Sequence, residues 1–368
     1  MARVPVSQRT IDWLLSEENP PVRYLTLTRL LDRSGSSREV RGAKARLGDY
    51  GPTKKILAQR KKIWRVGADV HAKYRGGYWQ LIFLGEFLAP RSPGVEEGVE
   101  LALEHRVQVG DGLAWLTAKD DEPWWGVHCM NANLLRAMVA LGFGRDRRVR
   151  AGLEHVAQDV VRAKGIPCYV IELGLLDLCH MSLPKVLLAL TSLPAEQRTP
   201  AMRRAAKICR ERLLEREVCN YVPRFTREWF AHLQASPDLP SSVTTKPERR
   251  AKLLAGKRKF LTKKGGLGER KEKQGWRRFG FPLHYNSDNL EALRALVQAK
   301  TPKRSPGVEF ALERVLERRG SDGRWKMEHS WNGKMIANVE TKGRPSRWIT
   351  FYALHVLRWF RGLEPGVS

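Results

Sequence analysis

A short amphipathic helix motif recurs along this chain and constrains the fold more than any other feature. In each copy a polar loop residue precedes apolar or small residues at positions i, i+3, i+4 and i+7, which is the spacing of one helix face. The copies begin at Tyr24, Leu81, Leu134, Leu183, Asn289 and Ile349. Most successive copies start about fifty residues apart, and one gap is about twice as long. A repeat of this length predicts a ring or solenoid of helical hairpins.

A second, outer helix is predicted before each of these inner helices. The outer helices are expected at 7–15, 53–61, 94–105, 147–163, 200–217 and 307–318. Ser92-Pro93 and Ser305-Pro306 are typical of an N-cap followed by a proline in the first helical position, so they predict matching starts for two of them. No strand pattern of comparable length occurs. We therefore expect an all-α fold of about six hairpins, an α/α toroid, in a single domain over residues 1–368.

The long gap between the fourth and fifth inner helices is filled by an insertion, residues 223–280. Its part from 246 to 278 contains fourteen basic and three acidic residues. Such a density of charge cannot be buried, so two interpretations remain: a flexible solubilising segment, or a surface that contacts a polyanion. In the second, Phe260 and Trp276 would stack on bases, and the phosphate contacts would come from Lys257, Arg258, Lys259, Lys263, Lys264, Arg277 and Arg278.

The whole chain is strongly basic, with 66 Lys and Arg against 39 Asp and Glu and a formal net charge of +27. This excess predicts attraction to polyanions such as nucleic acid and says nothing about the fold. No stretch reaches the roughly 18 apolar residues of a membrane span, and the first residues lack an apolar leader. We expect a cytoplasmic protein without a membrane span, and five cysteines in such a chain are expected to be reduced thiols.

The loops before the inner helices carry the candidate site residues. If the inner helices run parallel in a ring, their N-termini meet at one electropositive rim, which suits an anionic or electron-rich ligand. The acid and base candidates are His128, His180, His284 and Asp288. The ligand-binding candidates are Trp124, Trp125, Asn133, Tyr285, Lys334, Glu340, Lys342, Arg344 and Trp348. Cys129, Cys179 and His180 could form a soft metal site, with zinc as the default ion, or could be ordinary core groups.

Three segments also resemble a known superfamily. They are WLLSEENPPVRYLTLTRLLDR at 13–33, CMNANLLRA at 129–137 and KGRPSRWIT at 342–350. Together with the hairpin period they look like uncharacterised bacterial members of the α-α toroid superfamily, which includes terpenoid (squalene) cyclases and protein prenyltransferases. Gly323-Arg324-Trp325 is similar to the end of the glycine–tryptophan repeats of squalene cyclases. Lanthionine cyclases share the toroid and use a Cys, Cys, His zinc site, which the metal candidates resemble in residue type.

The resemblance implies a barrel of six inner and six outer helices around a central cavity, and a small isoprenoid or phosphorylated ligand. A prenyltransferase-like or squalene cyclase-like enzyme is one form of this hypothesis. A second hypothesis is a nucleic-acid-binding helical-repeat protein, because Asn19-Pro20-Pro21-Val22-Arg23 resembles the turn of a HEAT-type repeat and the insertion would contact phosphates. A third is a non-catalytic scaffold whose cavity is filled by its own side chains.

Overall fold

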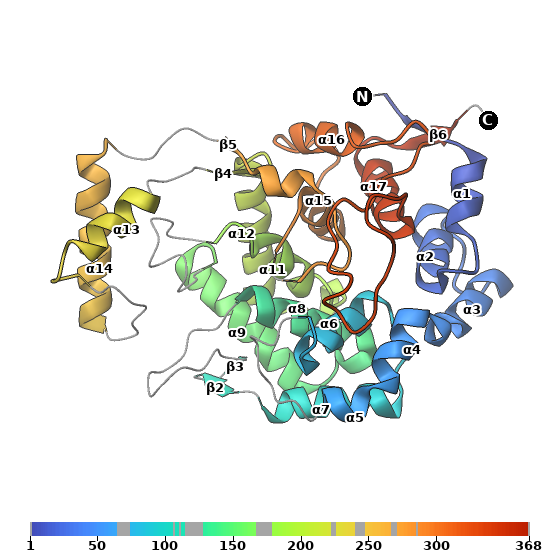
Figure 1. Ribbon diagram of the computed structural model, residues 1–368, viewed down its shortest axis with the longest axis horizontal. Helices are drawn as coiled ribbons and strands as arrows, with labels where there is room; N and C mark the ends of the chain where they lie inside the picture. Colours follow the sequence, from blue (N-terminus) through green and yellow to red (C-terminus); the bar gives the residue numbers. More distant parts are fainter. Residues whose placement is uncertain are drawn as a thin grey trace.

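The computed structural model describes residues 2–64, 74–105, 107–109, 112–114, 128–166, 179–221, 226–239, 247–265, 271–284 and 286–366. This part of the chain is mostly helical with little strand, so the all-α prediction is confirmed (Figure 1). Among the described residues, no helix has both the length and the apolar composition needed to cross a membrane.

All six copies of the recurring motif are helices. They are α2 (Pro20–Leu25, continued by the π-helix η1, Thr26–Leu30), α6 (Gly77–Glu86), α8 (His128–Met138, continued by η3, Val139–Phe143), α11 (Leu183–Leu190), α15 (Asn289–Gln298) and α17 (Arg347–Phe360). Each contacts the next in the series α6, α8, α11, α15, α17, and α17 contacts α2 and η1. The α6 and α8 backbones approach so closely at Gly85 that a Cβ atom there would lie 2.6 Å from the Cα of Ala137. These inner helices carry half of the buried residues of the main apolar core.

The outer helices pack on the inner ones in an order different from the predicted one. They are α1 (Gln8–Leu14), α3 (Arg38–Ala45), α4 (Gly51–Ala58), α5 (Arg60–Ile63), α7 (Pro93–Glu104), α9 (Arg147–Ala163), α12 (Pro200–Glu215) and α16 (Glu309–Leu316). Contacts join α2 to α3, α6 to α7, α8 to α9, α11 to α12 and α15 to α16, so the outer helix mostly follows its inner partner. Short connections explain this order, since they favour antiparallel packing of consecutive helices.

The predicted helix start at Ser92-Pro93 is confirmed, because α7 begins at Pro93 with Ser92 in the N-cap position, although the Ser92 side chain forms no cap hydrogen bond. At the start of α17, the Ser346 hydroxyl accepts a hydrogen bond from the backbone N–H of Ile349. The Ser305-Pro306 start is wrong, because α16 begins at Glu309. Between Pro306 and the start of α16 the chain turns through Gly307, whose φ of +82° is favourable only for glycine.

The strands are short and serve as ties between distant segments. Strand β1 (Val4–Val6) pairs in parallel with β6 (Leu363–Pro365), which brings the two ends of the described chain together (Figure 1). The other pairs are antiparallel: β2 (Val107–Val109) with β3 (Gly112–Ala114), and β4 (Asn220–Tyr221) with β5 (Lys271–Glu272). Short 3-10 helices occur at η2 (Leu47–Asp49), η4 (Ala195–Gln197) and η5 (Gln274–Arg277).

The insertion contributes two helices that lie apart from the other helices (Figure 1). They are α13 (Thr226–Gln234) and α14 (Pro247–Lys263). Trp229, Leu233 and Leu253 form their own buried cluster, separate from the main core. The two helices therefore pack on each other through a few apolar side chains.

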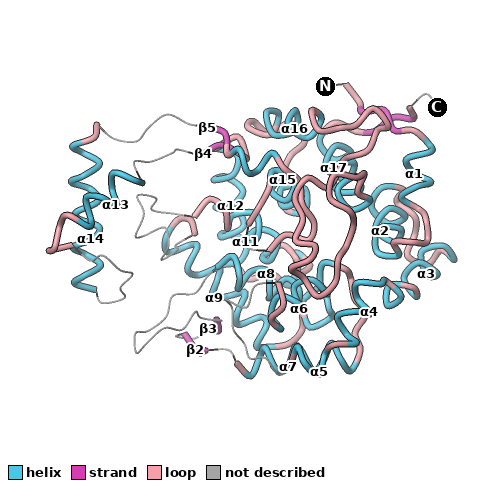
Figure 2. The backbone as a smooth tube through the Cα atoms, viewed as in Figure 1, coloured by secondary structure: helices cyan, strands magenta, loops and turns pink. Residues whose placement is uncertain are grey.

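A long loop between α16 and α17 runs across the front of the inner helices (Figure 2). Trp325 anchors this loop, since its side chain is fully buried and its Nε1 donates to the carbonyl of Val315 at 2.7 Å.

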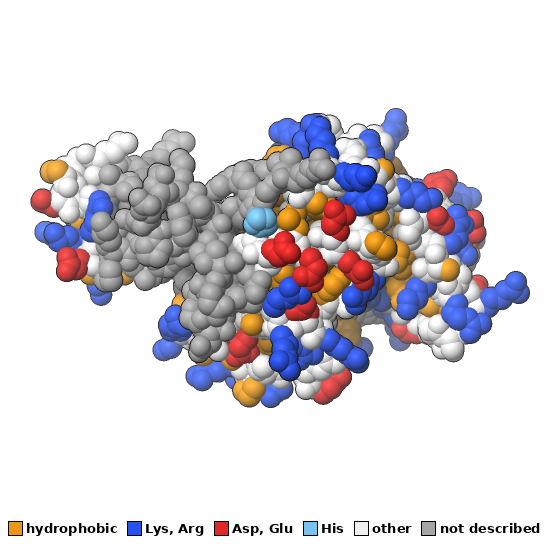
Figure 3. Space-filling view, turned by 90° about the horizontal axis from the view of Figure 1, so that it is seen from below, with side chains coloured by type: hydrophobic (Ala, Val, Ile, Leu, Met, Phe, Trp, Pro, Cys, Tyr) orange, Lys and Arg blue, Asp and Glu red, His pale blue; other side chains and the backbone are white. Residues whose placement is uncertain are grey.

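Lys and Arg side chains are spread over the face shown in Figure 3, with Asp and Glu among them, rather than gathered in one patch.

Candidate anion-binding cavity

A cavity of about 570 Å³ lies between the inner helices, near their C-terminal ends. Its polar lining residues are Arg29, Glu86, Asn133, Arg136, Thr191, Ser192, Arg294, Gln298, Lys300, Tyr352 and His355. Glu86 and Gln298 are the last residues of α6 and α15, and Thr191 is the C-cap of α11. Ala140 and Lys300 line it and are exposed, so the cavity opens on their side. This cavity therefore lies at the end of the inner helices opposite to the predicted N-terminal rim.

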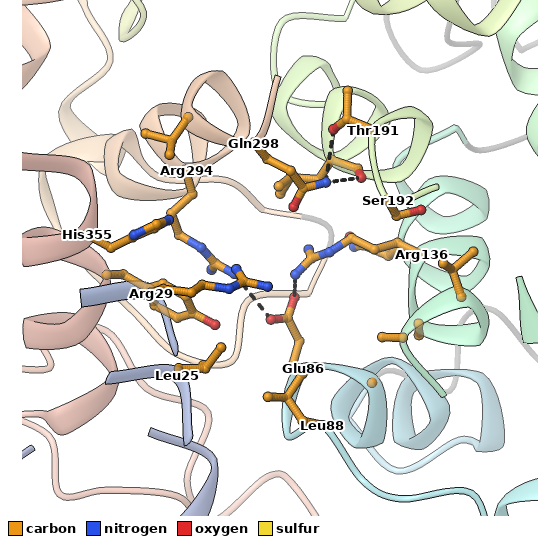
Figure 4. Close-up of a pocket in the computed structure, with 18 of the residues that line it drawn as sticks. Leu25, Arg29, Glu86, Leu88, Arg136, Thr191, Ser192, Arg294, Gln298 and His355 are labelled. Carbon is orange, nitrogen blue, oxygen red and sulfur yellow. Dashed lines mark hydrogen bonds and ion pairs between the residues drawn. The ribbon is translucent and has the colours of Figure 1, made fainter. Parts of the chain in front are cut away.

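Three arginines from three different inner helices surround one carboxylate in this cavity (Figure 4). Arg136 contacts Glu86 at 2.7 Å, and Arg294 contacts the other carboxylate oxygen at 3.5 Å. Arg294 also stacks on Tyr352, with its guanidinium carbon 3.4 Å from the ring centre. Among the described residues no carboxylate lies within ion-pair distance of Arg29 (Figure 4). Three positive charges therefore face one negative charge. Arg136 and Arg294 share Glu86, and Arg29 has no acidic partner among the described residues.

The pKa shifts follow from this crowding of like charges. Burial lowers the pKa of Arg29, and neighbouring Arg294 and Arg136 lower it further. Burial alone would raise the pKa of Glu86, but Arg136 and Arg294 reverse its effect and hold that carboxyl ionised. Burial, with Arg29 and Arg294, lowers the pKa of His355 to about 3, so its ring is neutral near pH 7. An anion entering the cavity would relieve the repulsion between the guanidinium groups.

A second buried ion pair lies close to the arginine cluster. Lys185 of α11 is fully buried and its Nζ donates to both oxygens of Glu291 in α15, at 3.0 Å each. Because the two charges cancel, this pair joins two helices without adding to the charge of the cavity. The pair still acts on the arginine cluster, because the positive charge of Lys185 helps to lower the pKa of Glu86.

The N-terminal side of the inner helices, where the site was predicted, is filled by aromatic side chains. The ring of His284 is fully buried. Its centre lies 4.2 Å from the ring centre of Trp331 and 5.3 Å from that of Tyr74. Trp348 is likewise buried, stacked on Phe281 at 4.0 Å. Two predicted site residues are therefore core residues on this side, because loop aromatics pack there.

Asp288 and Asn133 have structural partners. The Asp288 carboxylate caps α15 by accepting from the backbone N–H of Glu291 at 2.7 Å, and it also accepts from that of Gly280 at 3.1 Å. Burial raises the pKa of Asp288 to about 7. Asn133 donates to the carbonyl of His284 at 3.0 Å and lines the inner end of the cavity.

The polar residues of the last loop lie outside the cavity lining. The Glu340 carboxylate accepts from the hydroxyl of Ser346 and from the backbone N–H of Arg347, so it supports the start of α17. Lys334 lies with its Nζ 5.8 Å from the centre of the Trp331 ring. The remaining candidates of this loop are exposed: Lys342 and Arg344. The prediction that these residues line a ligand site is wrong for the cavity described here.

The predicted zinc ligands do not form a ligand set. His180 stacks on Trp276 with ring centres 4.9 Å apart, and its Nε2 is 2.9 Å from the carbonyl oxygen of Val218. Burial, followed by the nearby Cys179, raises the pKa of the Cys129 thiol to about 12, which disfavours the thiolate that binds metal. Among the described residues, no three His, Cys, Asp or Glu side chains are grouped so that they could hold a metal ion. Cys179 is buried, and its sulfur accepts a hydrogen bond from the Ser182 hydroxyl at 3.2 Å.

His128 belongs to a different cluster, on the outer side of α8. Its Nε2 is 3.4 Å from an oxygen of Asp159, and the Nε2 of His155 is 3.6 Å from the same oxygen. Burial lowers the pKa of His128 to about 4, so the ring is neutral near pH 7. Trp124, Trp125 and Tyr285 lie outside the described residues.

The candidates in the insertion fall into two groups. Lys257 is 2% exposed, and Trp276 is buried under His180, so neither can contact an outside polyanion. Phe260 packs on Trp229 at 5.4 Å between ring centres, which removes the second predicted stacking ring. Arg277 forms ion pairs with Glu272 of β5 and Glu317. The exposed candidates are Arg258, Lys259, Lys263, Lys264 and Arg278.

The cavity arginines were missed from the sequence, although a signal was present. Arg29, Glu86 and Arg294 each lie five residues after the first residue of their motif copy, at Tyr24, Leu81 and Asn289. Charged side chains at one repeated position of otherwise apolar inner helices indicate an internal polar site, because a buried charge needs a partner.

No protein-family model matches the chain, and no curated protein matches it either.

Proposed function

We propose that the inner and outer helices form an α/α toroid whose cavity binds a small anionic molecule that carries a phosphate or diphosphate group. The observation that carries this proposal is Arg29, a guanidinium without an acidic partner among the described residues, facing two further arginines that share Glu86. Guanidinium groups bind phosphate oxygens through paired, charge-assisted hydrogen bonds. A cavity of about 570 Å³ is within the range of small-molecule sites.

The rest of the lining supports a ligand with an apolar part. Leu25, Ile82, Leu88, Leu188 and Val297 line the same cavity as the arginines. An amphiphilic molecule such as a prenyl diphosphate would place its diphosphate at the guanidinium groups and its chain along these residues. This is the ligand class that the toroid resemblance suggests.

The proposal is one of binding rather than acid–base catalysis. Glu86 is held ionised by two arginines and His355 is held neutral, so neither group exchanges a proton near pH 7. The sequence also lacks the D-x-D-D cluster with which squalene-type cyclases protonate a polyprene.

Isothermal titration of the full chain with inorganic pyrophosphate tests the proposal. Saturable binding is expected, and Arg29→Gln should weaken it at least about tenfold, because a hydrogen bond to a charged group contributes about 1.5–3 kcal/mol. The matched control is Arg41→Gln, which removes an exposed guanidinium from the outer helix α3 and should leave affinity unchanged. The absence of saturable binding, or equal affinities for the two variants, would exclude the site.

A second titration examines the apolar walls. A prenyl diphosphate is expected to bind more tightly than pyrophosphate in the native protein and to lose the same factor in Arg29→Gln. Equal affinity for the two probes would keep the anion site and remove the isoprenoid part of the proposal.

A further inference from the structure

The exposed surface of α14 carries basic side chains in a line. Arg249, Lys252, Lys259 and Lys263 are all exposed. Their spacings of three, seven and four residues place them on one face of a helix. At 1.5 Å per residue the line extends about 21 Å. We call these four residues the α14 basic stripe.

The stripe has no acidic partners within the described part of the chain. None of its four side chains forms an ion pair there, whereas basic residues elsewhere, such as Arg46 with Glu17 and Arg361 with Glu309, are paired. The segment 247–265 contains eight basic residues and one acidic residue. Charges left unpaired on a surface that lies apart from the other helices are available to an outside polyanion (Figure 1).

The apolar face of α14, which borders the stripe, helps to determine which polyanion fits. Its apolar residues Leu253, Phe260 and Leu261 pack with Trp229 of α13. No leucine, phenylalanine or tryptophan side chain described in this hairpin is exposed for insertion into a lipid surface, as amphipathic membrane helices require. It also has no exposed aromatic ring on the stripe for stacking with unpaired bases, which single-strand binders use. With lipid insertion and base stacking excluded, contacts to phosphate groups are the interaction that the stripe can make.

We propose that the α14 basic stripe binds the phosphate backbone of double-stranded nucleic acid without sequence preference. Over about 21 Å of its axis, duplex DNA presents about twelve phosphates, more than enough for the four side chains. This site is separate from the arginine cavity and does not depend on the function proposed for it.

Fluorescence anisotropy of a labelled 24-base-pair duplex, titrated with the full chain, tests the stripe. Four phosphate contacts predict that affinity falls about a hundredfold between 50 and 200 mM KCl. The triple variant Lys252→Gln, Lys259→Gln, Lys263→Gln should reduce the salt slope by about 2.7 and bind at least tenfold more weakly at 50 mM KCl.

A matched control removes the same charge from another helix. Arg38, Arg41 and Lys44 are exposed on α3 at helical spacing, and their triple replacement by Gln should change affinity less than threefold. Unchanged melting temperatures would show that both triples fold. Arg29→Gln should bind the duplex like the native protein, which separates the two sites.

Several results would overturn the proposal: no duplex binding at 50 mM KCl, equal losses in the two triple variants, or tighter binding of a single strand than of the duplex. Binding to phosphatidylserine vesicles that depends on the stripe, without duplex binding, would assign the stripe to a membrane instead.

Discussion

The cavity makes its sharpest prediction at Glu86, the acid shared by Arg136 and Arg294. Glu86→Gln keeps the shape of the side chain and removes its charge. The contacts of 2.7 and 3.5 Å then lose their Coulomb attraction, and three guanidinium groups face one another without a carboxylate. The variant should therefore be less stable than the native protein and should bind a multivalent anion more tightly.

The magnitude follows from the burial of the groups. Each contact is worth about 5 kcal/mol of gross attraction at an effective dielectric constant of about 20, and desolvation offsets most of it. Removing one partner of a buried pair costs about 3–5 kcal/mol. The side chains of Arg136 and Arg294 keep 16% and 12% of their surface exposed to the cavity, so we expect the lower end, about 3 kcal/mol.

Urea unfolding followed by circular dichroism measures this effect, since urea leaves the ionic strength unchanged. In KCl alone, Glu86→Gln should lose about 3 kcal/mol of unfolding free energy. Pyrophosphate at a hundred times its dissociation constant for the variant should restore about 2.7 kcal/mol, and the same concentration should stabilise the more weakly binding native protein less. Glu17→Gln breaks an exposed pair with Arg46 and should change stability by less than about 0.5 kcal/mol. If Glu86→Gln is as stable as Glu17→Gln, or if pyrophosphate stabilises the variant no more than the native protein, the three guanidinium groups do not act as one anion site.

Two further predictions concern groups outside the cavity. Lys185→Met leaves Glu291 buried without its partner and should cost about 3–5 kcal/mol in urea unfolding, whereas the double variant Lys185→Met, Glu291→Leu should recover most of that loss; equal losses in both would show that the pair contributes nothing specific. Burial lowers the pKa of His180 to about 3, so its contribution to stability is present above pH 6.5 and is lost as pH falls toward 3, with a slope of about 1.4 kcal/mol per pH unit. His180→Gln should flatten the stability profile over this range, and an unchanged slope between pH 4 and 6 would show that the imidazole is already charged.

The positions of the inner helices could be predicted from the sequence because their burial imposes a helical period on the apolar residues. Arg147–Ala163 was located to the residue, since Asp146 caps its start and Lys164 ends it in a left-handed conformation. The partner of each inner helix was not predictable in the same way. An apolar stripe specifies that a helix is covered and does not specify which neighbour covers it.

Tertiary packing determines at which end of the inner helices the cavity lies. Polar residues just before a helix can face a cavity or cap the helix, and the sequence does not distinguish these roles. Asp288 caps α15, and His284 is enclosed by Trp331, which comes from a loop more than forty residues later. Which end of the inner helices this loop covers depends on contacts between distant segments, so the position of the cavity at the C-terminal ends could not be predicted from the sequence.

The location of the cavity at helix C-termini raises a competing explanation for its arginines. Helix C-termini carry partial negative charge, about half an elementary charge each, and basic side chains often bond their free carbonyls. The contacts of Arg29 argue against this role. The carbonyl of Arg29 itself is bonded by Arg358, and Gln298 bonds the carbonyl of Leu188 at the end of α11. These two carbonyls are thus bonded by other side chains, and within the described residues the Arg29 guanidinium forms no hydrogen bond or ion pair. Its charge is left for a group from outside the chain.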